Sequence, residues 1–502
     1  MTAEASYSPP QPTLRLNNSA ETHTTLATSL GGRRIPCHAG EPLRGVLGYT
    51  ARVSPRPYRR APRALALALA LSACTPASSP RGATDTAADA AAPADIARPA
   101  DAARPDAASP PRVVTDAPTF LRGAPTDPWW PGDVHVHATG ASNDTGGDST
   151  PSEIARVARE RGLAFVVLTD HSNSTGSDPG TLDEDPALHN QGPEFPFWDE
   201  VALLSVDDEF LMVDGNEVSP VTDEPRVVAP RGHIGCLPRD LSTFDRSGAF
   251  VDRPRGEVSG GQALAQALDR GCFAVVNHPY GLAPWIMYDW TSRDYDALEV
   301  WNGGNGFDAA DLAAWDAWRC DLLQGKATTP IGASDNHRVM RAPPGDVLNP
   351  ALGSPSTSVR AAALTWPNIM AGLARGDVAL HEGESLALLE GHAADGAWTP
   401  SGPWAWLHVH GRLDPAAAAS TLVVARAEAC ADPRPATTAP TVQQVVVYTR
   451  EVAPGEAFDL AVPVDATAAG VYTAALTSPL PAHYAAFSRA LVQPSAPQGG
   501  MP

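Results

Sequence analysis

The chain has 502 residues, which is too long for one ordinary domain, and 43% of them are hydrophobic, enough for a sizeable core. The 50 prolines and 42 glycines indicate long stretches outside that core. The formal charge is 36 − 57 = −21, and an acidic chain of this kind is a poor candidate for binding the phosphate backbone of a nucleic acid. No nucleic-acid partner is therefore expected.

The N-terminal region is predicted to carry a targeting signal over residues 53–74. Four arginines precede an apolar run of Ala and Leu over residues 64–71. That run is too short to cross a bilayer as an ordinary transmembrane helix, and it has the layout of a secretory signal peptide. A signal this far from the first methionine indicates that residues 1–52 are an extension from an upstream start codon, with Val46 or Val53 encoded by the true one.

The end of this signal, Leu71-Ser72-Ala73-Cys74, resembles the lipobox of bacterial lipoproteins. The resemblance implies that Cys74 becomes the lipidated first residue of an exported protein, anchored to a membrane on its periplasmic or cell-surface side. Residues 75–118 are rich in Ala, Pro, Asp and Thr and contain almost nothing that can pack. We expect a disordered tether between the lipid and the folded part.

The six cysteines show no CxxC spacing, so neither a zinc ribbon nor a redox motif is supported. A disulfide among the last four could form in an oxidising compartment, but the sequence alone cannot pair them. These four are Cys236, Cys272, Cys320 and Cys430.

From Trp129 onward, short apolar runs alternate with helical stretches, as in βα units around a parallel sheet or barrel. We place this region at 119–385. In its first run, GDVHVH, His135 and His137 share one face of a strand, so both imidazoles can meet one metal ion. Asp133 lies on the same face and is either a ligand or a group that orients a histidine.

Later apolar runs end in residues of the same chemistry. They contribute Asp170 and His171 from LAFVVLTDHS, Glu217 from FLMVDGNEVS, His233 from RGHIGCLP, His278 from CFAVVNHP, Glu299 and Asn302 from DALEVWNGG, and Asp335 and His337 from TPIGASDNH. In barrels of alternating strands and helices, functional residues gather at the carboxyl ends of the strands. Imidazoles and carboxylates in this number exceed what one tetrahedral ion needs, so two or three divalent ions are expected.

A second pair of alternating histidines, His408 and His410, occurs in WLHVHG. No acidic residue precedes the pair at the spacing of the first motif, and no TDH-type strand follows it. We interpret these two as surface histidines of a strand.

Taken in order, the motifs DVHVH, LTDHS, GNE, VNHP and SDNH resemble the PHP (polymerase and histidinol phosphatase) superfamily, and within it the CehA/McbA-type metallohydrolases. The resemblance covers about residues 128–385. It implies an α/β fold, a distorted (β/α)7 TIM-like barrel, with a site for Zn, Mn or Fe ions. The metal ligands that it implies are His135, His137, His171, Glu217, His233, His278, Asp335 and His337.

The loop after the first motif, ATGASNDTGGDST, offers Asp144 and Asp148 as a further ligand, and the choice between them stays open. If neither binds, the site is binuclear rather than trinuclear. Clustered cations would generate hydroxide near neutral pH, and Asp170 or Asp335 could accept the proton of the attacking water.

The resemblance implies cleavage of a small-molecule phosphoester or of a carboxylic or carbamate ester. A phosphate would favour a nearby cation such as Arg338, and an aryl ester would favour aromatic residues such as Trp285 and Tyr288 in the loop after the NHP motif. Asn302 is a further candidate for contact with the substrate.

Two other functions are weighed against the hydrolase. One is a catalytically silent metal-binding surface lipoprotein on the same scaffold. The other, an amidohydrolase, is disfavoured because no strand presents a bridging lysine and the last motif is DxH. Residues 386–495 are rich in expected strands and predict a small β-sandwich, interpreted as a structural cap. The oligomeric state cannot be predicted.

Overall fold

Strands dominate the part of the chain that the structure describes. The computed structural model describes residues 119–142, 145, 148–171, 194–206, 208–218, 232–247, 260–281, 292–303, 306–339, 350–434, 438–479 and 482–494. The expected upstream extension, lipoprotein signal, Cys74 and tether lie outside these residues. None of the helices described is long and apolar enough to cross a membrane.

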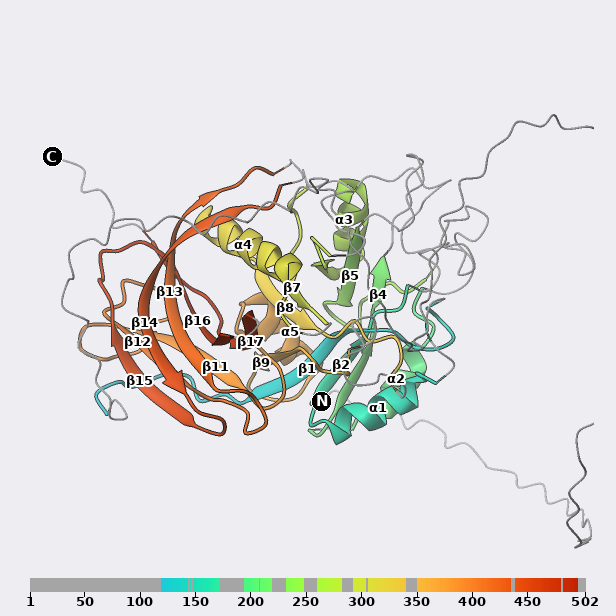
Figure 1. Ribbon diagram of the computed structural model, residues 1–502. Helices are drawn as coiled ribbons and strands as arrows, with labels where there is room; N and C mark the ends of the chain where they lie inside the picture. Colours follow the sequence, from blue (N-terminus) through green and yellow to red (C-terminus); the bar gives the residue numbers. More distant parts are fainter. Residues whose placement is uncertain are drawn as a thin grey trace, which may run out of the picture. The chain divides into compact units, whose positions relative to one another are not determined.

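The described helices are α1 (Pro151–Glu160), α2 (Trp198–Leu204), α3 (Gly260–Asp269), α4 (Ala309–Leu323) and α5 (Trp366–Ala374) (Figure 1). The strands that carry the motifs are β1 (Trp129–Val136), β2 (Phe165–Leu168), β3 (Leu211–Asp214), β4 (Asn216–Val218), β5 (His233–Pro238), β6 (Cys272–Asn277), β7 (Ala297–Asn302) and β8 (Thr329–Ala333). The later strands are β9 (Ser356–Arg360), β10 (Val378–His381), β11 (Leu386–His392), β12 (Trp406–Arg412), β13 (Ser420–Ala431), β14 (Thr441–Val452), β15 (Ala457–Pro463), β16 (Gly470–Pro479), β17 (Ala482–Phe487) and β18 (Leu491–Gln493).

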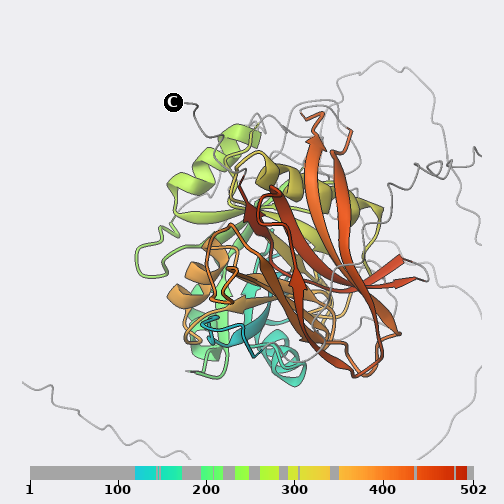
Figure 2. The ribbon, with the colours of Figure 1, turned by 90° about the vertical axis from the view of Figure 1, so that its left-hand side faces the viewer.

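These strands form three sheets. The largest has the order β14-β13-β16-β17-β10-β9-β1-β2-β3, with β18 beside β16. The second, β4-β5-β6-β7-β8, is antiparallel from β4 to β6 and parallel from β6 to β8. The third, β11-β12-β15, is antiparallel throughout. In Figure 2 the orange and red strands of the C-terminal region lie together as long, crossing ribbons.

The prediction of a distorted (β/α)7 barrel followed by a separate small β-sandwich is wrong. The described residues contain only five helices, and three of the motif strands, β4 to β6, pair antiparallel. One sheet also continues from the motif region into the C-terminal region, because β10 pairs with β17. A short, fully buried apolar run such as His233–Pro238 fits an antiparallel strand as well as a parallel one, so periodicity could not distinguish them.

The core beneath the motif strands is built from their continuous apolar runs. All four side chains of β2 are buried, as expected for a strand covered on both faces. β1 approaches β2 closely at Gly132, where an added Cβ would lie 2.3 Å from the ring of Phe165. The apolar face of α1, including Ile154 and Ala158, packs against Val166 of β2. These contacts fix the strands whose ends carry the histidines.

The carboxyl ends of β1 and β8 lie side by side. The backbone N–H of His137 donates to the carbonyl of Asn336 at 2.9 Å, and the N–H of Asp335 donates to the carbonyl of His135 at 2.9 Å. The first and last motifs therefore meet, although about 200 residues of chain separate them.

Two disulfides lie within the described residues. Cys236 and Cys272 join the neighbouring strands β5 and β6, and Cys320 and Cys430 join α4 to β13. The second disulfide lies close to a buried ion pair, in which Arg434 Nη2 is 3.0 Å from Asp321 Oδ1. The four later cysteines are thus all paired.

Candidate metal centre

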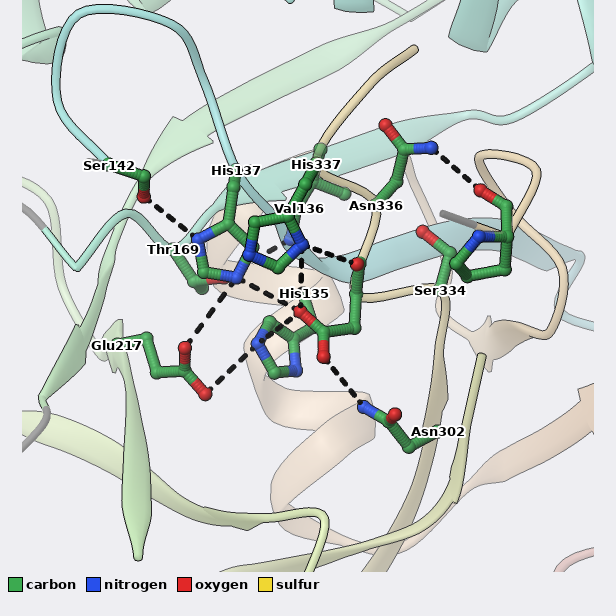
Figure 3. Close-up of polar contacts among 12 residues, drawn as sticks. His135, Val136, His137, Ser142, Thr169, Glu217, Asn302, Ser334, Asn336 and His337 are labelled. Atoms are coloured by element: carbon green, nitrogen blue, oxygen red, sulfur yellow. Dashed lines mark hydrogen bonds and ion pairs between the residues drawn. The ribbon is translucent and has the colours of Figure 1, made fainter. Parts of the chain in front are cut away.

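The motif residues converge where the parallel strands end. His135 lies at the end of β1 and His137 directly follows it, His171 follows β2, and His278 follows β6. Because β5 runs antiparallel to β6, its first residue, His233, reaches the same edge, opposite Asn277 in the register. Figure 3 shows His135, His137 and His337 directed toward one another, with the Glu217 carboxylate beside them.

Glu217 is the centre of this group, and only 1% of its side chain is exposed. Its Oε1 lies 2.9 Å from His233 Nδ1, 3.1 Å from His135 Nε2 and 3.2 Å from His278 Nε2. Its Oε2 lies 3.2 Å from His171 Nδ1 and 3.5 Å from His137 Nε2. One carboxylate thus touches five imidazoles, three through one oxygen and two through the other, which suits a group that bridges metal ions.

Asp335 forms the second carboxylate of the group. Its Oδ1 lies 3.1 Å from His137 Nε2, 3.3 Å from His135 Nε2 and 3.6 Å from His337 Nδ1. Its side chain is 23% exposed, against 1% for Glu217. Asp335 and the 16% exposed His337 therefore mark the side on which the site opens to solvent.

The six imidazoles are packed ring to ring. The closest pair, His137 and His337, is stacked with 3.9 Å between ring centroids, and His137 lies 4.7 Å from His171. Several overlapping sets place three donor atoms within 4.8 Å of one another. They are His137, His171 and His337; His135, His137 and Glu217; His135, His278 and Asp335; and His171, Glu217 and His233.

Hydrogen bonds to Nδ1, on the side of the ring away from the site, fix the tautomers of His135 and His137. Glu299 Oε1 lies 2.9 Å from His135 Nδ1, so Nδ1 carries the proton that it donates to the carboxylate. Ser142 Oγ donates to Asp170 Oδ1 at 2.9 Å, so it accepts the Nδ1 proton of His137, also at 2.9 Å. In the neutral form of each ring, the lone pair is consequently on Nε2 and faces the site.

The donor atoms of His135, His137 and Asp335 are placed as metal ligands would be. In the neutral rings the Nε2 lone pairs of His135 and His137 face Asp335 Oδ1 at 3.3 and 3.1 Å, so a positive charge, either a proton on Nε2 or a metal ion, belongs between these atoms. Buried polar groups without compensation are costly. Imidazole nitrogen and carboxylate oxygen are ligands of Zn, Mn and Fe ions. The donor set therefore fits divalent metal ions.

The pKa values of two buried histidines and of Glu217 are shifted by burial and by the charges of their neighbours. Burial and the nearby His337 lower the pKa of His137 to about 3. Burial also acts to lower the pKa of His135, but the carboxylates of Asp335, Glu217 and Glu299 hold it well above its ordinary value. Burial opposes ionisation of Glu217 as well, yet the surrounding imidazoles, His233 first, keep its pKa well below the usual range. Glu217 is thus an anion that the positive charge of the surrounding groups stabilises.

Asp133 lies outside the histidine group. Its Oδ2 accepts from Ser334 Oγ at 2.5 Å and from the Gly353 N–H at 2.8 Å, and its Oδ1 accepts from the backbone N–H of Ser334 and of His135. Burial raises its pKa to about 6. Asp133 fastens β1 to the segment after β8, and so it positions His135 through the backbone.

Asp170 also lies behind a ligand. Its Oδ1 accepts from the Ala138 N–H at 2.6 Å and from Ser142, whose hydroxyl holds His137. Its Oδ2 is buried with no hydrogen-bond partner among the described residues. Burial raises its pKa to about 7. This position favours a role in holding His137.

The other candidates are placed less centrally. Asn302 Nδ2 donates to Asp335 Oδ2 at 3.3 Å and to Glu299 Oε2 at 3.1 Å, so it orients these carboxylates. Arg338 is exposed next to His337. Asp148 is partly buried in the loop after β1. Asp144, Trp285 and Tyr288 lie outside the described residues.

Sequence reasoning named Glu299 at the end of its strand without giving it a role, and it did not name Ser142. Glu299 is the only charged residue in the apolar run ALEVWN, and it is buried at 1%. An acid in such a run needs a partner. No comparable signal marks Ser142, because it lies in a polar loop rich in small residues.

Comparison with known proteins gives little additional information. No family model and no curated protein matches the chain. One solved structure is similar, a two-domain protein from Bacteroides vulgatus containing a predicted PHP-like metal-dependent phosphoesterase. The match has 15% identity and a TM-score of 0.36, and it covers 71% of this chain and 93% of that one. A likeness this distant carries no argument about function, which is argued below from the site itself.

Proposed function

We propose that the chain is a metal-dependent hydrolase that cleaves an ester bond of a small molecule, either a phosphoester or a carboxylic or carbamate ester. The observation that carries this proposal is the pair of fixed tautomers at His135 and His137. Glu299 and Ser142 hold the Nδ1 protons, so in the neutral rings both Nε2 lone pairs are directed at carboxylates in a buried group. Such a site is assembled to receive cations.

Two or three divalent ions, of Zn, Mn or Fe, are proposed as the cofactors. The residues that would hold them are His135, His137, His171, Glu217, His233, His278, Asp335 and His337, with Glu217 as the bridge. When bound, such ions act as Lewis acids toward the ester and lower the pKa of water to near neutrality.

The protein's own groups would position the reactants. Asp335 is anionic, because the imidazoles of His135 and His337 help to hold its pKa well below its usual range against the effect of burial. It is also the more exposed of the two carboxylates, so it can accept a proton from an attacking water at the open side. Arg338, next to His337 and exposed, could approach an anionic substrate.

We propose in addition that the protein is exported and anchored through Cys74. The two disulfides support this proposal, since disulfides persist in oxidising compartments and are rare in reducing ones. Radiolabelled palmitate incorporated by the wild-type chain, and lost in a Cys74→Ser variant, would support the anchor. Equal labelling of both chains would contradict it.

Two measurements test the proposed hydrolase function. Elemental analysis of the purified chain gives the bound metal, and a screen of p-nitrophenyl phosphate against naphthyl carbamate and acetate esters gives the turnover. A His135→Ala/His137→Ala variant should lose bound metal and turnover together. The exposed pair Arg156→Ala/Glu160→Ala on α1 is the control and should keep both. Turnover that persists in the metal-depleted histidine variant would refute the proposal, and bound metal without turnover of any ester would favour a silent metal-binding protein.

A further inference from the structure

The second histidine pair, on β12, does have acidic neighbours. They come from the adjacent strands rather than from the same motif: Glu390 on β11 lies opposite His408, and Asp459 on β15 lies opposite His410. His410 Nε2 is 2.9 Å from Glu390 Oε2, and His408 Nδ1 is 3.7 Å from the same oxygen. His408 and His410 are thus partly exposed residues of a strand that have acidic partners on the neighbouring strands.

The two rings are arranged as a pair. They stack with 4.4 Å between centroids and 19° between planes, and each directs a nitrogen toward Glu390 Oε2. Ligands bonded to one tetrahedral ion at about 2.0–2.1 Å lie roughly 3.3 Å apart. The distances of 2.9 and 3.7 Å bracket that separation. One ion could therefore bind all three groups after small side-chain shifts.

The outer contacts of the pair match those of metal-bound histidines. His408 Nε2 lies 2.7 Å from Asp459 Oδ1, so Nε2 carries the proton and the Nδ1 lone pair is turned toward Glu390. A metal-binding histidine typically donates its other N–H to a carboxylate in this way. The Glu390 carboxylate is itself oriented, because Arg360 Nη1 donates to Oε1 at 3.0 Å and leaves Oε2 for the histidines.

A buried imidazole adjoins the pair. His392 lies two residues along β11 from Glu390, and its ring centroid is 5.9 Å from that of His408. Its Nδ1 donates to the Gly396 carbonyl at 3.0 Å. Its Nε2 is buried and has no hydrogen-bond partner among the residues that the structure describes. An uncompensated imidazole nitrogen beside two others is a second sign that a cation belongs here.

We propose that Glu390, His408 and His410 form a second metal site, distinct from the metal centre at the strand ends, for one divalent transition-metal ion of the zinc class. Two imidazoles and one carboxylate are a ligand set that zinc accepts, with a further position for water or an outside ligand. The side chains of His408 and His410 are 18% and 30% exposed, so an ion can enter from solvent. The site joins β11 to β12 and does not depend on the proposed hydrolase activity.

Zinc binding by the full chain tests this proposal. In equilibrium dialysis, a His408→Gln/His410→Gln variant should bind one zinc ion fewer than the wild-type chain. An Arg412→Gln variant is the matched control, since Arg412 is exposed, lies on β12 and shares the face of the pair. It should keep the full number of ions. The same zinc content in the histidine variant and the control would overturn the proposal.

A second measurement distinguishes the two sites. Its first part uses the wild-type chain, so it does not require that a variant folds. Crystals of the wild-type chain equilibrated with zinc should show an anomalous peak within bonding distance of Glu390 Oε2 and both histidines. In dialysis, a His135→Ala/His137→Ala variant should retain this ion while losing ions of the metal centre. Absence of the peak in zinc-equilibrated crystals would overturn the second site, whatever the metal centre contains.

Discussion

Glu299 Oε1 lies 2.9 Å from His135 Nδ1, and both side chains are almost fully buried. The other oxygen of the same carboxylate accepts from the backbone N–H of His278 at 2.7 Å. One residue of β7 thus orients a ring on β1 and fixes the backbone at the end of β6. Its effect reaches the candidate ligands through hydrogen bonds rather than through direct contact with a metal ion.

A Glu299→Gln substitution should weaken metal binding at the centre about 10- to 100-fold, because residues that orient metal-binding histidines typically have effects of this size. The amide introduced at this position can direct an N–H at His135 Nδ1. His135 would then no longer be fixed in the tautomer that carries its proton on Nδ1. Titration against a chromophoric chelator measures the affinity. Glu200→Gln, at an exposed position of α2, serves as the control. Equal affinities for the two variants would show that Glu299 has no orienting role.

Ser142 offers a second test of positioning. Its hydroxyl joins His137 Nδ1 to Asp170 Oδ1, with 2.9 Å to each atom. Ser142→Ala removes this link, and metal affinity and kcat/KM should each fall by roughly 10-fold or more. Ser142→Thr keeps a hydroxyl and should recover part of both. If the alanine and threonine variants behave alike, the hydroxyl is not what holds His137.

Asp377 is expected to stabilise the folded state in a pH-dependent way. Its carboxylate binds Arg360 at 2.9 Å, Arg375 at 3.0 Å and also Arg489. Burial opposes its ionisation, but Arg489 and Arg360 hold its pKa below the ordinary value. A depressed pKa gives stability that is present above about pH 4 and is lost as the pH falls through the lower folded value.

Asp377→Asn should therefore lower the free energy of unfolding by about 3–5 kcal/mol at pH 7, the usual cost of removing one partner of a buried ion pair. The difference from wild type should shrink below about pH 4. Urea unfolding at several pH values measures both effects. Asp199→Asn, which breaks only the exposed pair with Arg246, should cost about 1 kcal/mol or less. A pH-independent difference would contradict the prediction.

The disulfide between Cys320 and Cys430 closes a loop across 110 residues. Restricting the unfolded chain over such a length stabilises a protein by about 4–5 kcal/mol in the loop-entropy model. A Cys320→Ser/Cys430→Ser variant should lose roughly that amount in urea unfolding. The disulfide between Cys236 and Cys272 spans 36 residues and should contribute less when replaced in the same way. The reverse order would show that strain or residual structure outweighs loop length.

The sequence was informative about the metal centre because strand alternation is local. Two histidines two residues apart on a strand must share a face, and an apolar run that ends in His or Asp places that residue at a sheet edge. These rules brought together His135, His137, Glu217 and Asp335. They could not show that Asp133 and Asp170 turn away from the histidines, since side-chain partners such as Ser334 come from distant segments.

The fold was harder to predict because strand pairing is not local. Nothing in the apolar run of β5 indicates whether its neighbours run parallel or antiparallel. Nothing in β10 indicates that it pairs with β17, about 100 residues later. The pair on β12 shows the same limit, because Glu390 and Asp459 come from the strands on either side. A search for acids along the same strand could not find them.

The pairing of β10 with β17 limits how the chain can be shortened. Leu380 and His381 lie opposite Phe487 and Ala486, so the last strands of the chain complete a sheet that begins with β3. A protein cut at the expected boundary after residue 385 would leave the hydrogen-bonding edge of β10 bare. Exposed edges of this kind recruit other strands and promote aggregation. The C-terminal region thus covers an edge of the sheet that contributes to the candidate metal centre, and expression trials should retain it.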